Sequence, residues 1–163
     1  MTTQTVTEAE AKFQADPGSA RGTPSVTATL VDGRAHLAAG AFTWDADLPA
    51  VIGGTNQAPS PTAYLLGALA GCGVAFLQDT LAPQFGVRID TITAVARCST
   101  DLRGLIGMDG ASPELMDIAL DIEVRTSDPT DRVDAMFAAW RERCPIFLAL
   151  LRPKSVELTT RVG

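Results

Sequence analysis

The stretch SPTAYLLGALAGC, residues 60–72, opens the longest helix that the sequence predicts. Ser60 is a favourable N-cap, and Pro61 suits the first helical position because its missing N–H would have no partner there. The apolar pattern continues to Thr80, and Pro83 is expected to end the helix. We therefore expect one long, mostly buried helix at the centre of the fold.

This helix is unusually rich in small residues. Gly67, Gly71 and Gly73 lie on either side of Cys72, and each glycine costs up to about 1 kcal/mol relative to alanine in a helix. Such a cost indicates that another backbone packs very close to the helix. No apolar run that includes this helix is expected to reach the length of a membrane span.

Short β-branched runs surround the helix in the sequence. Before it, residues 26–31, 34–38 and 41–45 predict an antiparallel meander, with Asp32-Gly33 as a hairpin turn and residues 49–61 as a loop. After it, residues 89–98 and 117–125 alternate between apolar and polar side chains, as strands with one buried face do.

The rest of the chain predicts a second long helix and a last strand. Asp128 is expected to cap this helix, Cys144 ends its apolar stripe, and Pro145 breaks it or starts a new helix through Leu151. Residues 155–162 alternate like a strand. Strands interrupted by single helices predict an α+β domain over residues 25–163, preceded by an extension, residues 1–24, with a short helix over residues 7–15.

Composition limits the function. The formal net charge of -6 argues against binding nucleic acid or an anionic membrane, since both require a basic surface. The first residues, MTTQTVTEAEAKFQ, do not resemble a secretory signal. We therefore expect a cytoplasmic protein whose three cysteines are free, metal-bound or redox-active rather than joined in structural disulfides.

The cysteines leave two interpretations open. Cys72, Cys98 and Cys144 all fall on apolar faces, and free cysteine is among the most buried residue types, so each is a candidate core residue. Cys144, however, precedes Pro145 at a helix break, where a thiol has the freedom that a redox partner needs. A reactive Cys72 would require a nearby cation, for which Arg34, Arg97 and Arg103 are candidates.

Other catalytic classes are poorly supported. His36 is the only histidine, and its place after a hairpin turn predicts a strand residue with a polar partner rather than a base. No CxxC or HExxH spacing indicates a metal site, and no GxSxG context indicates a serine hydrolase. No cofactor is expected.

Two segments resemble the OsmC/Ohr family of OsmC-like proteins and organic hydroperoxide reductases. Residues 60–72 resemble its first signature, and Arg143-Cys144-Pro145 resembles its second. The resemblance covers roughly residues 26–162. It implies an OsmC-like α+β fold in which antiparallel sheets pack on two long helices, and an intertwined homodimer.

The resemblance also implies a stress-response antioxidant activity. Cys72 would be the peroxidatic thiolate that attacks an organic hydroperoxide, Cys144 the resolving thiol, and a dithiol the reductant. Active members carry a Glu just after the helix-opening proline, where this chain has Thr62 and Ala63, and an Arg in the first meander, near Arg34. Without the Glu, we expect weak activation of Cys72. The alternative function is a non-catalytic dimer that binds a small apolar ligand.

Overall fold

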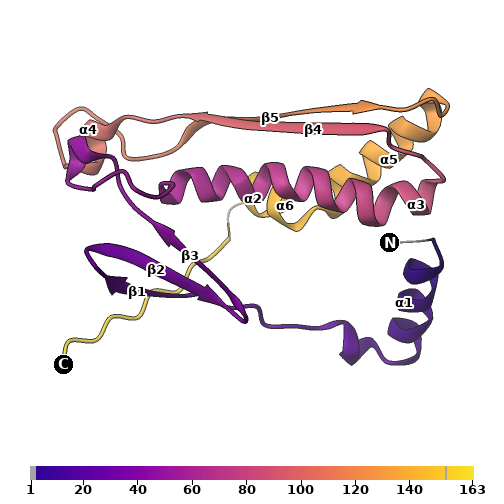
Figure 1. Cartoon of the computed structure of the whole chain (residues 1–163), viewed down its shortest axis with the longest axis horizontal. Coiled ribbons are helices and arrows are strands. Elements are labelled where there is room, and N and C mark those ends of the chain that lie inside the picture. The colour runs from indigo at the N-terminus through magenta and orange to yellow at the C-terminus, as the bar shows by residue number, and fades with distance from the viewer. Residues whose placement is uncertain (1–2, 153) are drawn as a thin grey trace.

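The fold combines two antiparallel sheets with a long central helix, in a computed structural model that describes residues 3–152 and 154–163 (Figure 1). The elements, in chain order, are α1 (Thr3–Ala15), β1 (Thr27–Val31), β2 (Arg34–Ala39), β3 (Phe42–Ala46), α2 (Pro61–Phe76), α3 (Ala82–Phe85), β4 (Thr91–Ser99), α4 (Leu102–Leu105), β5 (Met116–Arg125), α5 (Thr130–Arg143) and α6 (Pro145–Leu151). The prediction of an α+β fold is confirmed.

The first sheet is the expected meander, in the order β1-β2-β3. Asp32 and Gly33 both have positive φ, 48° and 77°, as a tight hairpin turn requires. Across β2 and β3, His36 pairs with Asp45 and Leu37 pairs with Trp44. Figure 1 shows this meander set apart from the layer formed by α2 and the second sheet.

The second sheet is the β4–β5 hairpin, which lies along α2 (Figure 1). The half-buried residues alternate along β4, as the sequence predicted, with Ala94 among them. Gly73 of α2 faces this layer: a Cβ built on it would lie 3.2 Å from Ile122 Cδ1 and 3.5 Å from Ala94 Cβ. The same construction at Gly67 and Gly71 meets nothing within 4 Å among residues 3–152 and 154–163.

The central helix is longer than the sequence predicted, and the expectation that Pro83 ends it is wrong. A π-helical turn over Leu77–Leu81 follows α2, with the Ala82 N–H donating to the Leu77 carbonyl five residues back. This wider turn rearranges the hydrogen bonds just ahead of Pro83, so its missing N–H does not stop the helix. The helix ends at Gly86, which adopts a left-handed φ of 62°.

The whole helical run, Pro61–Phe85, has 25 residues and is long and apolar enough to cross a membrane by those criteria alone. The expectation that no apolar run reaches this length is therefore wrong. In this fold the run is only partly buried: Leu69 and Gly73 are the buried residues of α2, so the expectation of a mostly buried helix is wrong for the single chain, and the core contacts lie toward its end. Leu77 and Leu81 are fully buried against Met136 and Trp140 of α5, together with Cys144.

Two further expectations fail. Asp128 does not cap α5, whose N-cap is Pro129; the Asp128 carboxylate instead accepts a hydrogen bond from the Arg88 backbone N–H. Residues 155–162 form no strand. Residues 154–163 have no regular structure, and Val156 and Leu158 are almost fully exposed. A strand needs a neighbouring edge, and neither sheet pairs with this segment among the described residues.

Replacing Gly73 with leucine is expected to lower the free energy of unfolding by about 1–3 kcal/mol, because the side chain would overpack against Ile122 and Ala94. Urea denaturation measures the effect. Ala135→Leu, at an exposed position of α5, is the matched control and should change stability little. Equal stability of Gly73→Leu and the wild type would contradict the packing described here.

Candidate active site

The structure brings Cys72 and Cys144 together. Their sulfur atoms lie 2.9 Å apart although the residues are 72 positions apart in sequence. Both are free thiols, and the separation exceeds the length of about 2.05 Å of a covalent disulfide bond. The contact is therefore a thiol pair positioned for disulfide formation.

The local sequence explains how the second thiol reaches this place. Pro145 cannot continue the hydrogen bonds of α5, so Cys144 leaves the helical conformation with φ -67° and ψ 113°. Its N–H still donates to the Trp140 carbonyl at 2.9 Å, and its own carbonyl accepts from the Leu148 N–H at 3.0 Å. The Cys144 backbone is thus fixed on both sides of the break.

The two thiols differ in exposure. Cys144 is fully buried, whereas Cys72 is half-buried. An external reagent would therefore reach Cys72 first, and Cys144 would react only with a group already attached to Cys72.

The surroundings of Cys72 favour its neutral form. Burial, the hydrogen bond with Cys144 and the repulsion between the two negative charges raise the pKa of Cys72 to about 11, and the Ile146 backbone N–H offsets only part of this rise. No cation of the described chain is among these influences. Cys72 is therefore protonated near neutral pH.

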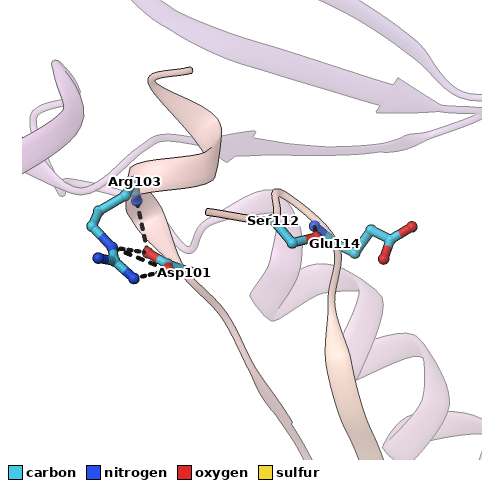
Figure 2. A network of polar contacts seen from close by, with 4 residues as sticks. All are labelled: Asp101, Arg103, Ser112 and Glu114. Atoms are coloured by element: carbon cyan, nitrogen blue, oxygen red, sulfur yellow. Dashed lines mark hydrogen bonds and ion pairs between the residues drawn. The ribbon is translucent and has the colours of Figure 1, made fainter. Parts of the chain in front are cut away.

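Each of the three candidate arginines has another partner. Arg34 donates to the side chain of Gln57, and Arg97 pairs with Asp121 across the β4–β5 hairpin. Figure 2 shows Arg103 folded back on Asp101, which caps α4. Ser112 and Glu114 close the same β4–β5 connection on its other side (Figure 2).

Arg34, on β2, lies near the start of α2 and is far from the thiols. It lines a pocket that includes Pro61, and the 11 residues from Pro61 to Cys72 span about 16 Å of helix. A guanidinium at the Pro61 end does not reach Cys72 of the same chain. The structure therefore brings together Cys72 and Cys144, but it does not bring Arg34 to them.

A pocket lies next to Trp140 and Phe147, on the two sides of the α5–α6 break, and neither cysteine is among the residues that line it. It has a volume of about 320 Å³, and Trp140 and Phe147 line it together with Arg141 at an exposed position. A second pocket of about 160 Å³ shares Leu120 and Phe147 with the first. The two pockets together form an apolar groove between β5 and the α5–α6 break.

Sequence reasoning missed a buried carboxylate that organises the loop ahead of α2. Asp47 accepts hydrogen bonds from the Thr55 hydroxyl and from the backbone N–H groups of Leu48, Thr55 and Gln57. The Thr55 hydroxyl and the Gln57 N–H hold the pKa of Asp47 well below its usual range. An aspartate followed by a loop rich in Gly and Pro was the available signal.

The remaining candidates lie outside the thiol pair. Cys98 is a half-buried free thiol on β4. His36 lies 2.8 Å from Asp45 through its Nδ1, so it is the strand residue with a polar partner that the sequence predicted. Over residues 3–152 and 154–163, no cluster of three or more His, Cys, Asp or Glu side chains could hold a metal ion.

Cys72 of the central helix and Cys144 at the α5–α6 break are thus neighbouring thiols in an α+β protein. The chain belongs to the OsmC-like family: the family model described as OsmC-like protein matches residues 54–159. No curated protein matches the sequence.

Solved structures share the fold at low identity. An OsmC-like protein from Mycoplasma pneumoniae is 21% identical, with a TM-score of 0.66 over 80% of this chain and 88% of that one. An organic hydroperoxide resistance protein from Legionella pneumophila is 18% identical, with a TM-score of 0.59 over 79% and 89%. One from Elizabethkingia anophelis is 15% identical, with a TM-score of 0.59 over 79% and 88%.

Proposed function

We propose that this protein is a thiol-dependent peroxidase that reduces organic hydroperoxides in the cytoplasm. The observation that carries the proposal is the 2.9 Å contact between Cys72 and Cys144. The accessible thiol and the buried thiol have the exposures that a peroxidatic and a resolving cysteine need. Two structural neighbours are named organic hydroperoxide resistance proteins, which supports the same class of substrate.

The proposed reduction of an organic hydroperoxide has three steps. The Cys72 thiolate attacks the distal oxygen of ROOH, the O–O bond breaks, and the products are Cys72 sulfenic acid and the alcohol ROH after protonation. The Cys144 thiol then displaces water from the sulfenic acid and forms the Cys72–Cys144 disulfide. A dithiol reduces this disulfide by exchange and leaves as its own disulfide.

The apolar groove is suited to the organic part of the substrate. Phe137, Trp140 and Phe147 offer aromatic surface, and Trp140 donates a hydrogen bond to the Cys72 carbonyl. Hydrogen peroxide would gain nothing from this surface, because apolar burial favours only an alkyl or aryl group. We therefore expect a preference for organic over inorganic peroxide.

The proposal includes a homodimer. Gly67 and Gly71 face open space in the single chain, and Val156 and Leu158 are almost fully exposed. A second copy would bury both surfaces and could bring its own Arg34 toward Cys72, which the same chain does not do. Sedimentation as a folded monomer at micromolar concentration would contradict the dimer.

The second candidate function is a non-catalytic OsmC-like protein that binds a small apolar ligand. The raised pKa of Cys72 favours it, because a protonated thiol is a poor nucleophile. The groove beside Trp140 would then hold the ligand itself.

A thiol titration with one equivalent of cumene hydroperoxide separates the two functions. The peroxidase is expected to lose two thiols and release one cumyl alcohol, and dihydrolipoamide should restore both thiols. An unchanged thiol count, together with a rise in Tm on adding cumyl alcohol, would favour the binding protein.

Thr62→Glu is expected to accelerate oxidation of Cys72 about tenfold. Thr62 follows Pro61, which lines a pocket with Arg34, so a carboxylate at residue 62 would orient Arg34 toward the Cys72 of a second copy. A thiol pKa lowered by one unit raises the thiolate fraction about tenfold below the pKa. The measurement is the rate of Cys72 oxidation by cumene hydroperoxide at pH 7.

The matched control is Thr62→Gln, which has a similar shape without the charge. It should react like the wild type. Equal rates for Thr62→Glu and Thr62→Gln would show that Arg34 does not act on Cys72 in the assembled protein.

A further inference from the structure

Trp140 contacts the backbone of both cysteines. Its indole N–H donates to the Cys72 carbonyl of α2 at 3.4 Å, and its own carbonyl accepts the Cys144 N–H at 2.9 Å. The side chain is only 4% exposed. A single residue therefore joins the helix of the first thiol to the turn that carries the second.

Trp140 is also held from the far side of the helix break. The ring of Phe147, in α6, packs against it with centroids 5.2 Å apart and planes inclined at 43°. Because α5 ends at Arg143 and α6 begins at Pro145, this contact spans the break at Cys144. The ring thus fixes the angle at which the chain passes Cys144.

We propose that Trp140 is a positioning residue for the cysteine pair, holding Cys72 and Cys144 at the separation from which the disulfide forms. The inference rests on the proposed function, in which this pair is redox-active. Disulfide geometry is strict, and the sulfurs are already 2.9 Å apart. Loss of the indole N–H would allow α2 and the α5–α6 break to separate, and the disulfide would be disfavoured relative to the dithiol.

The second tryptophan provides a matched control. Trp44 is half-buried on β3 and packs against Tyr64 with centroids 6.4 Å apart. Its ring belongs to the meander, away from both cysteines. Trp44→Phe and Trp140→Phe make the same chemical change, and only the second removes the N–H that donates to the Cys72 carbonyl.

The test is a redox titration of the full chain against mixtures of reduced and oxidised glutathione, with the Cys72–Cys144 disulfide quantified by alkylation and mass. Trp140→Phe is expected to weaken the disulfide about threefold to tenfold, the range of one neutral hydrogen bond. Trp44→Phe should match the wild type, and the alkylation rate of Cys98 should be unchanged in both. A Trp140→Phe equilibrium within twofold of the wild type would overturn the proposal.

A second measurement requires no change at residue 140. In the Trp44→Phe protein, Trp140 gives the only indole N–H signal in a ¹⁵N–¹H spectrum, and this signal is expected to shift when glutathione disulfide oxidises the pair. An unchanged signal would overturn the proposal even if Trp140→Phe did not fold. Neither measurement uses a peroxide, so failure of the peroxidase proposal and failure of this one are distinguishable.

Discussion

Replacing Cys72 with serine is expected to reduce the consumption of cumene hydroperoxide to the background rate. Cys72 is the half-buried member of the pair, and Cys144 is fully buried, so a peroxide has no other thiol of the pair to attack. A serine hydroxyl in the same place is not ionised and does not cleave the O–O bond. The measurement is peroxide consumption with dihydrolipoamide as the reductant.

Serine variants of the other two cysteines test the roles of Cys144 and Cys98. In the absence of a reductant, Cys144→Ser should consume one equivalent of peroxide and stop at the sulfenic acid of Cys72, which a dimedone adduct would detect. Cys98→Ser should behave like the wild type, because Cys98 lies on β4 outside the pair. Loss of activity in Cys98→Ser, or full activity in Cys72→Ser, would contradict the assignment of the thiols.

The rate of Cys72 oxidation is expected to rise about tenfold for each pH unit from 6 to 9, about 1,000-fold in all, because only the thiolate attacks and its fraction is small below the pKa. The rate increases with pH because the pKa of Cys72 lies above this range. Burial and Cys144 raise the pKa of Cys72 to about 11, so the thiolate fraction has no plateau in this range. The measurement is the pseudo-first-order oxidation rate at low peroxide concentration.

A matched series distinguishes the thiol's titration from general effects of pH. The rate of Cys72 alkylation by iodoacetamide should follow the same slope, because it also needs the thiolate. A fast rate that is flat from pH 6 to 9 would show that a cation, such as the Arg34 of a second copy, already lowers this pKa. The expectation that Cys72 is weakly activated, because Thr62 and Ala63 stand where active members have a Glu, would then be wrong.

Local chemistry predicted most of the fold. Ser60 accepts a hydrogen bond from the Ala63 N–H as an N-cap should, and the alternating pattern of β4 correctly gave its buried face. These features depend on neighbours within a few residues. The thiol pair was identified through the two signatures around Cys72 and Cys144 rather than by periodicity, which assigned both residues to the core.

The predictions from the sequence were wrong where the local structure depends on contacts between residues far apart in the chain. Pro83 stays within a helix because of the π turn ahead of it, and Asp128 bonds to Arg88 instead of capping α5. Residues 155–162 alternate like a strand but pair with no sheet edge within the described part of the chain. The partners of the arginines and the contact of Trp140 with Cys72 also join residues far apart in sequence, and no periodicity encodes them.

Peptide mapping after one equivalent of cumene hydroperoxide shows which cysteines form a disulfide. We propose that Cys72 and Cys144 form one redox pair because their sulfurs lie 2.9 Å apart. We expect a single disulfide between the Cys72 and Cys144 peptides, with Cys98 still alkylatable after unfolding. A disulfide that includes Cys98, or no disulfide while peroxide is consumed, would contradict it.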